Sequence, residues 1–202
     1  MFITFEGIEG AGKSTQIRLL AERLRAAGRE VLTTREPGDG PLGGELRRLV
    51  LSPPDGTDID ERTELLIMLA DRAQHVAAVI RPALAGGAVV VCDRYADSSV
   101  AYQGYARGVD RAFIASANRF ATGDLTPDVT VLLDVAPEIG LGRQTERNRM
   151  EGEALVFHNK VRQGFLELAS GEPERFVVVD ASQAPEIVHS AIWTLLAPRL
   201  GL

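Results

Sequence analysis

Two kinds of hydrophobic pattern alternate along the chain. Short apolar runs, typical of buried parallel strands, are followed by longer stretches in which apolar residues recur every three or four positions, as on one face of a helix. Strands are predicted at residues 2–5, 31–34, 88–92, 129–135 and 176–179. Helices are predicted at residues 15–27, 42–51, 60–84, 111–121, 153–168 and 184–196. The alternation predicts βαβ units and hence an α/β fold of three layers, with a five-stranded parallel sheet between helices.

The same pattern predicts a single domain that spans residues 1–202. This length suits one sizeable hydrophobic core, and the chain contains no internal repeat and no low-complexity linker. The clearest loop is the proline- and glycine-rich segment 52–56. Residues 143–151 form a polar, arginine-rich segment between two predicted helices, which fits either a mobile lid or a solvated loop.

Charge and cysteine content exclude several classes of protein. The net charge is −6, which argues against a nucleic-acid-binding surface. The single cysteine, Cys92, allows no internal disulfide and lies in a predicted buried strand. The N-terminal residues do not follow the pattern of a signal peptide, and no apolar run reaches the roughly 18 residues of a membrane span. We therefore expect a cytoplasmic protein that does not bind membranes.

The most specific signal is segment 7–14, Gly-Ile-Glu-Gly-Ala-Gly-Lys-Ser, which fits the phosphate-binding pattern G-x-x-x-x-G-K-[ST] between a predicted strand and a predicted helix. Glycines let backbone N–H groups converge on an anion, and the start of the following helix adds a favourable dipole. Lys13 is expected to bridge the terminal phosphates of a nucleotide, and Ser14 to hold Mg²⁺. The alternative is a chance glycine turn before a helix.

Charged residues follow the predicted strands at the edge where parallel sheets bind ligands. Arg35 and Arg94 suit phosphate oxygens, and the alternative for each is a surface ion pair. Asp93 directly follows an apolar strand, as Mg²⁺-binding carboxylates often do. Glu9 is electrostatically unusual inside an anion-binding loop. It either accepts a hydrogen bond from a sugar hydroxyl of a second substrate or is a solvated loop residue.

These motifs, taken in order, resemble those of bacterial thymidylate kinases nearly from end to end. The matching segments are 5–14, 35–38 (Arg-Glu-Pro-Gly), 93–95 with 101–104 (Asp-Arg-Tyr and Ala-Tyr-Gln-Gly), 127–128 with 133–135, and 157–169. The phosphate loop alone is common to many nucleotide-binding proteins, whereas this set of signatures is specific to the family.

The resemblance implies the fold of P-loop nucleoside monophosphate kinases. It also implies a transferase that phosphorylates thymidine monophosphate (dTMP) to the diphosphate with ATP, a step of dTTP biosynthesis. Mg²⁺ would accompany ATP, and the protein would be a homodimer. Catalysis would consist of positioning and charge neutralisation without a covalent intermediate.

The resemblance further implies site residues. The residues expected to bind ATP are Gly7, Glu9, Gly10, Ala11, Gly12, Lys13, Ser14, Thr15 and Arg143, the last against the adenine. The residues expected to bind dTMP are Glu9, Arg35, Met68, Arg72, Arg94, Ser99, Tyr102 and Gln103. Arg35, Arg72 and Arg94 would hold its phosphate, Glu9 its sugar hydroxyl, and Gln103 with Arg72 the thymine edge. Ser14 and Asp93 would bind the metal.

The segment 143–151 is expected to act as a lid. One branch of the family lacks an arginine in the phosphate loop and supplies it from the lid, and this chain, with Ala11 in the loop, resembles that branch. Arg147 and Arg149 would then be catalytic together with Lys13 and Arg94. Met68 stands where the family commonly has a phenylalanine that stacks on thymine, and an ordinary core position is its alternative.

Two rival functions remain at this point: a kinase of the same fold with another small acceptor, and a P-loop switch or ATPase that couples hydrolysis to a partner. The arginines at the strand ends and the absence of an Asn-Lys-x-Asp motif disfavour the switch. Among the histidines, His75 is expected on a helix surface. His158 has no carboxylate or cysteine at metal-ligand spacing, so no structural metal site is expected.

Overall fold

The computed structural model describes residues 1–54, 57–143, 149–150 and 152–202. Five parallel strands form one sheet in the order β2-β3-β1-β4-β5. The strands are β1 (Phe2–Glu6), β2 (Val31–Arg35), β3 (Val89–Asp93), β4 (Val129–Asp134) and β5 (Phe176–Asp180). The predicted sheet is confirmed, and every strand boundary lies within one residue of its expected position.

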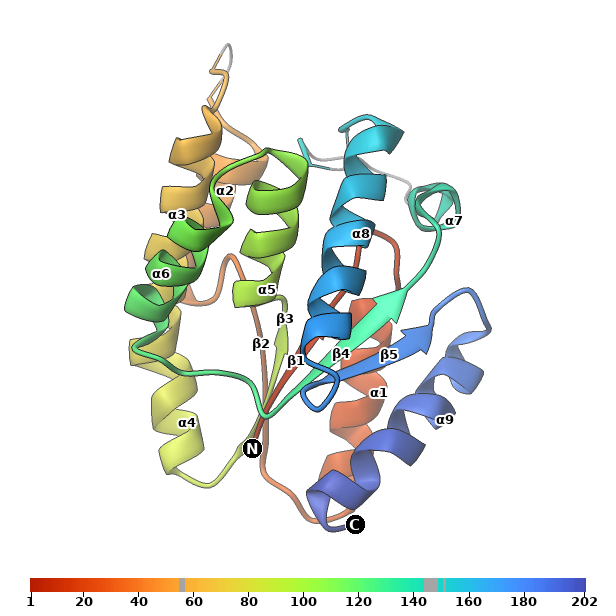
Figure 1. Ribbon diagram of the computed structural model, residues 1–202. Helices are drawn as coiled ribbons and strands as arrows, with labels where there is room; N and C mark the ends of the chain where they lie inside the picture. The colour runs from red at the N-terminus through yellow and green to blue at the C-terminus, as the bar shows by residue number, and fades with distance from the viewer. Residues whose placement is uncertain (55–56, 144–148, 151) are drawn as a thin grey trace.

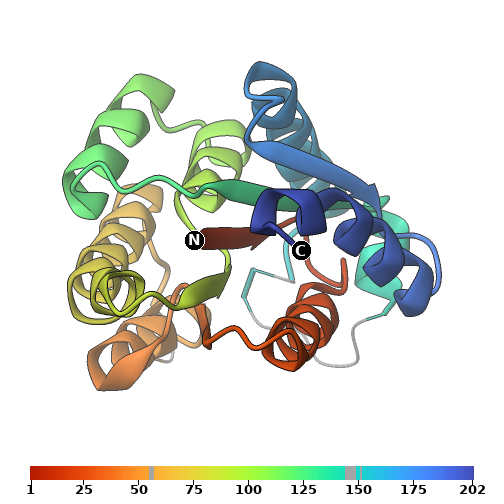
Figure 2. The ribbon, with the colours of Figure 1, turned by 90° about the horizontal axis from the view of Figure 1, so that it is seen from below.

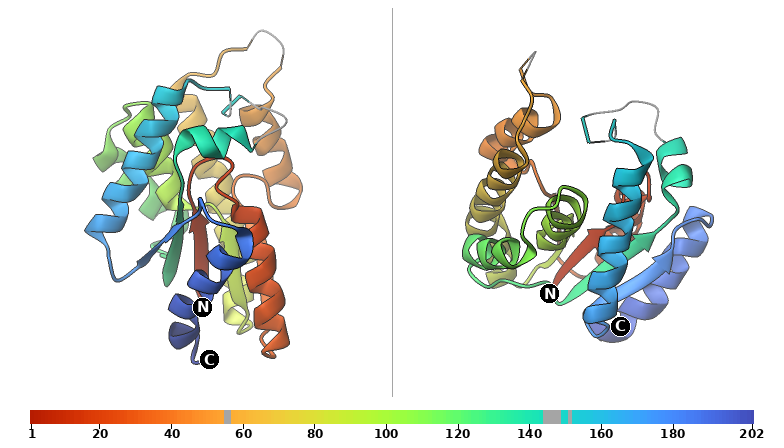
Figure 3. Two further views of the ribbon diagram at one scale, coloured as in Figure 1. Left: turned by 90° about the vertical axis from the view of Figure 1, so that its right-hand side faces the viewer. Right: turned by 45° about the horizontal axis from the view of Figure 1, so that its top comes forward.

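Helices cover both faces of this sheet (Figure 1). They are α1 (Lys13–Ala26), α2 (Gly40–Leu51), α3 (Glu61–His75), η1 (Val76–Ile80), α4 (Arg81–Ala85), α5 (Ala96–Ser99), η2 (Val100–Ala106), α6 (Arg111–Thr122), α7 (Pro137–Gly142), α8 (Leu155–Gly171), α9 (Pro185–Leu196) and η3 (Ala197–Leu200). Helix α1, with α9 beside it, packs on one face, and α5 and α8 lie on the other (Figure 2, Figure 3). None of the described helices combines the length and the hydropathy that crossing a bilayer requires.

The predicted helix 60–84 is built from three consecutive elements, α3, η1 and α4. Pro82 explains the interruption, because proline has no N–H to donate to the carbonyl one turn earlier and its ring crowds that carbonyl. The hydrogen-bond ladder shifts instead, and Arg81 N–H donates to Val76 O, five residues back. The result is one turn of π-helix inside a continuous helical segment.

The hydrophobic pattern predicts no helix in the segment that contains α5 and η2. Its buried side carries polar residues, among them Ser99, Tyr102 and Gln103, and it includes Gly104. An apolar stripe at helical spacing is therefore missing, and hydrophobic periodicity cannot detect the helix. This segment supplies one wall of the site described below.

The strand register brings the expected site residues to one edge of the sheet. Asp93 pairs with Phe5 on one side and with Arg35 on the other. The central strand β1 is completely buried because helices cover both of its faces, whereas the edge strand β5 is exposed at alternate positions. The carboxyl ends of β1, β2 and β3 consequently lie at one level.

The phosphate loop (residues 7–14) connects β1 to α1 and passes close to α7. Gly7, Gly10 and Gly12 have φ angles of 138°, 70° and 91°, a region that favours glycine. A Cβ on Gly10 would lie 1.9 Å from Gly140 O, whereas a Cβ on Gly12 would meet nothing within 4 Å. Gly10 is thus required both for its backbone angle and for the close contact with α7.

We expect Gly10→Ala to destabilise the protein much more than Gly12→Ala. Both substitutions incur the cost of a left-handed alanine, about 1–2 kcal/mol, but only Gly10→Ala forces the loop away from α7. Urea unfolding of both variants without nucleotide measures the difference. Equal losses of unfolding free energy would show that the contact between Gly10 and α7 does not limit stability.

Candidate active site

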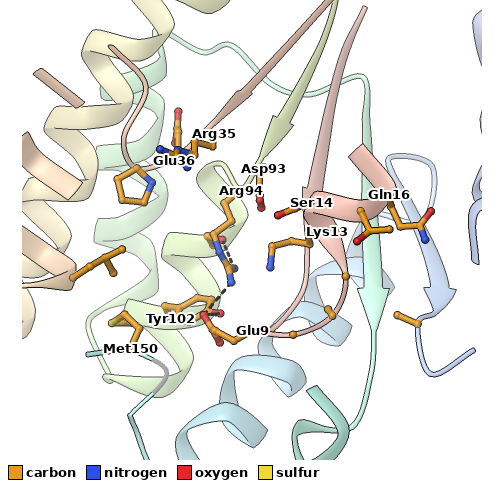
Figure 4. Close-up of a pocket in the computed structure, with 18 of the residues that line it drawn as sticks. Glu9, Lys13, Ser14, Gln16, Arg35, Glu36, Asp93, Arg94, Tyr102 and Met150 are labelled. Carbon is orange, nitrogen blue, oxygen red and sulfur yellow. Dashed lines mark hydrogen bonds and ion pairs between the residues drawn. The ribbon is translucent and has the colours of Figure 1, made fainter. Parts of the chain in front are cut away.

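A cavity of about 630 Å³ opens at the carboxyl edge of the sheet, between the phosphate loop, α3 and η2 (Figure 4). Most residues predicted to bind substrates line it: Glu9, Gly10, Ala11, Gly12, Lys13, Ser14, Thr15, Arg35, Met68, Arg72, Asp93, Arg94, Ser99, Tyr102, Gln103 and Arg143. Gly7 is not among the lining residues. It lies against β4, where a Cβ would approach Leu133 O to 2.6 Å.

Lys13 is buried at the start of α1 and its side chain turns back over the phosphate loop. Its Nζ donates to Gly7 O at 3.3 Å and to Ile8 O at 3.2 Å, which leaves one of three ammonium N–H donors for a ligand. Burial, together with the positive charge of Arg94, lowers the pKa of Lys13. An anion in the loop would relieve that repulsion.

Arg94 lies just after β3 with φ of 70°, an uncommon angle for a residue with a side chain. Its Nη1 donates to Gly7 O at 3.0 Å and to Ser98 Oγ at 3.2 Å, and its Nη2 donates to Glu9 Oε1 at 3.0 Å. The backbone angle turns the guanidinium into the cavity toward the phosphate loop (Figure 4). Geometry of this kind is typical of a side chain fixed for binding.

Glu9 is buried, and its carboxylate lies among Arg94, Tyr102, His158 and Lys13. Its Oε1 accepts hydrogen bonds from Arg94 and, at 2.6 Å, from the Tyr102 hydroxyl, and its Oε2 lies 3.3 Å from His158 Nδ1. Burial raises the pKa of Glu9, but Arg94, His158, Lys13 and Tyr102 together lower it to about 2. The alternative of a solvated loop carboxylate is therefore wrong.

His158 lies beside Glu9, a neighbour that the sequence pattern does not indicate. The sequence shows no carboxylate near it, yet α8 packs against η2 and the side chain is completely buried beside Glu9. The two residues are far apart in the chain, so no local pattern could pair them. Only the packing of α8 against η2 brings His158 next to Glu9 of the phosphate loop.

Arg72 is buried, and most of its hydrogen-bonding capacity is used within the protein. Nε donates to Glu36 Oε2 at 2.8 Å, Nη1 donates to Ser99 Oγ and to Asn118 Oδ1, and Nη2 donates to Tyr95 O at 3.0 Å. Four of its five N–H donors are thus occupied, which leaves one on Nη2. One free N–H cannot form the bidentate pair by which arginine commonly binds a phosphate, but it can donate to a carbonyl oxygen.

His75 is not on a helix surface, as the sequence analysis expected, but is buried against the loop after β2. Its Nδ1 donates to Glu36 Oε1 at 2.9 Å, and its Nε2 lies 2.6 Å from Thr34 Oγ1. The expectation was wrong because the polar side of α3 faces Glu36 of the Arg-Glu-Pro-Gly motif. Glu36 therefore anchors both His75 and Arg72.

A second missed residue, Arg47, faces the cavity beside Arg35. Arg47 Nη1 donates to Pro37 O at 2.8 Å, and burial together with the charge of Arg35 lowers its pKa. The exposed side chain of Arg35 has no hydrogen-bond or ion-pair partner among the described residues. The two guanidiniums make this end of the cavity attractive to an anion.

Asp93 and Ser14 fit a magnesium site. Within the part of the chain that the structure describes, Asp93 Oδ1 is buried without a hydrogen-bond partner. Its charge acts on Lys13, its carboxyl points toward the end of the cavity that holds Ser14 (Figure 4), and the Ser14 hydroxyl is exposed there. An unpaired carboxylate oxygen and a hydroxyl are oxygen ligands of the kind that Mg²⁺ uses together with water and phosphates.

Two arginines of the expected lid segment, residues 143–151, lie in the part of the chain that the structure describes. Arg143 Nη1 donates to Gly10 O at 3.2 Å and to Ala181 O at 3.1 Å, so it lies where the phosphate loop meets the end of β5. Arg149 donates to Val50 O at 2.9 Å and is ion-paired with Glu64 of α3, away from the phosphate loop. Arg147 lies outside the described residues.

Comparisons with known proteins point to one family. The model of the thymidylate kinase family matches residues 5–192. A thymidylate kinase of Solidesulfovibrio magneticus is 52% identical and the match covers 99% of this chain and 100% of that protein. A thymidylate kinase of a Synechococcus strain is also 52% identical, with coverage of 100% and 97%. The chain belongs to the thymidylate kinase family.

A solved structure agrees with this assignment. The crystal structure of thymidylate kinase from Ehrlichia chaffeensis superposes with a TM-score of 0.82 at 35% identity and covers 97% of this chain and 98% of that one. Both the P-loop kinase fold and the family suggested by the sequence motifs are thereby confirmed. ATP-dependent phosphorylation of dTMP is the activity of thymidylate kinases.

The pKa of Glu9 predicts how stability depends on pH. A carboxyl with a pKa of about 2 in the folded chain and 4.5 as its ordinary value stabilises the fold above about pH 4.5, and that contribution is lost as the pH falls toward 2. We therefore expect Glu9→Gln to be less stable than the wild type at pH 7, by a difference that shrinks between about pH 5 and pH 3. Urea unfolding without nucleotide at several pH values measures it.

Glu22→Gln is the control for this experiment, because it removes an exposed carboxylate of α1 and should change stability little at either pH. A difference for Glu9→Gln that stays constant or grows on acidification would contradict the assignment of Glu9 as a buried, charge-paired carboxylate.

Proposed function

We propose that this chain transfers the terminal phosphoryl group of ATP to dTMP through the residues of the described cavity. The observation that carries the proposal is the arrangement of this cavity. A phosphate loop lies at one end, guanidiniums lie in the middle, and two buried side chains suited to a base edge, Arg72 and Gln103, lie at the other end. A nucleoside monophosphate fits with its phosphate toward the loop and its base toward α3.

The donor end is assigned to ATP and Mg²⁺. Lys13 supplies one free N–H and a positive charge to the terminal phosphates, and the glycine-rich backbone surrounds them. Asp93 and Ser14 would hold Mg²⁺, which would neutralise charge on the phosphate oxygens. Arg143, which bridges the loop and the end of β5, borders the adenine.

The acceptor end is assigned to dTMP. Arg35, Arg47 and Arg94 surround its phosphate, and the single free N–H of Arg72 donates to a carbonyl of the base. Glu9 keeps Arg94 and Tyr102 in place and accepts a hydrogen bond from the sugar hydroxyl. Met68 is half-buried on the cavity wall and packs against the thymine ring, with a softer contact than an aromatic residue would give.

The assembly of the protein is part of the proposal. Residues 1–202 form one domain, and two copies associate through α3 and α6, which pack against each other and expose Leu66, Phe113 and Phe120. Phe120 is 90% exposed, which is unusual for a phenylalanine unless a partner covers it. A cytoplasmic location stays a prediction.

The acceptor assignment predicts a strong preference for dTMP. In a panel with ATP and Mg²⁺, kcat/KM for dTMP should exceed that for AMP, GMP and dCMP by at least about 100-fold, because a misfitting base leaves buried polar groups unpaired. Production of ADP measures turnover. Lys13→Ala is the control and should lower kcat by about 10²–10³ without loss of the folded state. Equal turnover of AMP and dTMP would contradict the assignment of the acceptor.

The lid assignment predicts that the segment 143–151 supplies an arginine to the transferred group, because Ala11 leaves the phosphate loop without one. Arg149→Ala should lower kcat sharply, and Arg147→Ala/Arg149→Ala should lower it by about 10³ or more, while the melting temperature shows that both variants fold. The lid would be a solvated loop if the double variant kept a kcat close to that of the wild type.

A further inference from the structure

Glu64 of α3 is a completely buried carboxylate for which the proposed reaction has no use. Its two oxygens face different partners. Oε1 accepts a hydrogen bond from Gln103 Nε2 at 2.8 Å, whereas Oε2 accepts from Arg107 Nη2 at 3.3 Å and is ion-paired with Arg149. The same carboxylate thus contacts the residue expected to read the base and two arginines that lie outside the base pocket.

The arginines keep Glu64 ionised. Burial raises the pKa of Glu64, but the hydrogen bonds from Arg149 and Gln103 and the charge of Arg107 lower it below its ordinary value. An ionised carboxylate accepts hydrogen bonds and cannot donate them. The Gln103 amide therefore has one favourable orientation, with its nitrogen toward Glu64, because the opposite orientation would place two oxygens against each other.

This orientation decides which end of Gln103 faces the ligand. Its nitrogen is engaged by Glu64, and within the described ranges no donor contacts its carbonyl oxygen, Oε1. Gln103 lines the cavity. The cavity therefore offers an acceptor at Gln103 and, from the remaining N–H of Arg72, a donor.

The resulting pair of groups complements thymine and opposes cytosine. The Watson–Crick edge of thymine carries an N–H donor at N3 beside the carbonyl acceptor O4, whereas cytosine carries an acceptor at N3 beside an amino donor. An acceptor from Gln103 and a donor from Arg72 match the first pattern and are unpaired in both positions against the second.

We propose that Glu64 is a specificity-determining positioning residue, which excludes cytosine by holding the Gln103 carbonyl oxygen toward the base. The inference rests on the proposed function, since it concerns the same base pocket. Glu64 acts through Gln103 and does not itself touch the ligand. Arg107 and Arg149 both pair with the other oxygen, Oε2, so either of them leaves a positive charge on the side of the carboxylate that faces away from Gln103.

The test is Glu64→Gln, assayed by kcat/KM with dTMP, dUMP and dCMP. A glutamine at 64 can donate as well as accept, so the Gln103 amide becomes free to turn. The ratio of kcat/KM for dCMP to that for dTMP should rise by about 10- to 100-fold, the equivalent of one or two hydrogen-bond mismatches. The ratio for dUMP to dTMP should stay unchanged, because uracil has the same N3 donor and O4 acceptor as thymine.

Arg149→Met is the matched control. It removes a partner of Glu64 Oε2 and leaves the contact of Oε1 with Gln103 in place. It should slow the reaction with every acceptor and leave the dCMP-to-dTMP ratio unchanged. If Glu64→Gln alone is too unstable to assay, Glu64→Gln/Arg149→Met removes both members of the ion pair and should show the same rise in the ratio.

The outcomes distinguish failure of this inference from failure of the proposed function. A wild-type enzyme that prefers dTMP, combined with an unchanged ratio in folded Glu64→Gln, would overturn the inference and leave the function intact. An equal rise of the ratio in Arg149→Met would also overturn it, because discrimination between cytosine and thymine would then depend on Arg149 and not on the contact between Glu64 and Gln103. A wild-type enzyme that does not phosphorylate dTMP would overturn both.

Discussion

Buried glutamates hold four of the guanidiniums in and beside the cavity, and the site depends on this pairing. Glu9 holds Arg94, Glu36 holds Arg72, and Glu64 holds Arg107 and Arg149. A buried cation without a partner is costly, whereas a paired and hydrogen-bonded one is tolerated. The carboxylates therefore allow a high density of positive groups to form before any phosphate binds, and they fix the direction in which each group points.

The parallel sheet is what brings these pairs together. Glu9 and Arg94 follow neighbouring strands, so their loops meet at one edge although 85 positions separate them. Arg72 and Gln103 come from helices that cross above that edge, α3 and η2. Loops that directly follow the strands thus form the phosphate end of the site, whereas packing between helices forms the base end.

This division explains how much the sequence could predict. The strands, the phosphate loop and the residues at strand ends depend on local pattern, and they were located to within one residue or confirmed as lining the cavity. The helix of residues 96–106 and the burial of His75 and His158 depend on polar contacts between distant segments, and such contacts leave no periodicity in the sequence. Family resemblance supplied roles for Gln103 and Arg72, but it did not supply the carboxylates that orient them.

The two oxygens of Glu64 have separate partners, which matters for the lid movement proposed above. If Arg149 leaves Glu64 to approach ATP, Arg107, which contacts the same oxygen, Oε2, still places a positive charge beside the carboxylate. Oε1 then continues to hold the Gln103 amide in the same orientation. Thymine would be recognised in the same way before and after closure. Oε1 of Glu64 orients Gln103, whereas Arg149 contacts the other oxygen, Oε2. In the proposed mechanism, Glu64 can therefore contact both the base pocket and the lid arginine, and closure over ATP leaves recognition of dTMP unchanged.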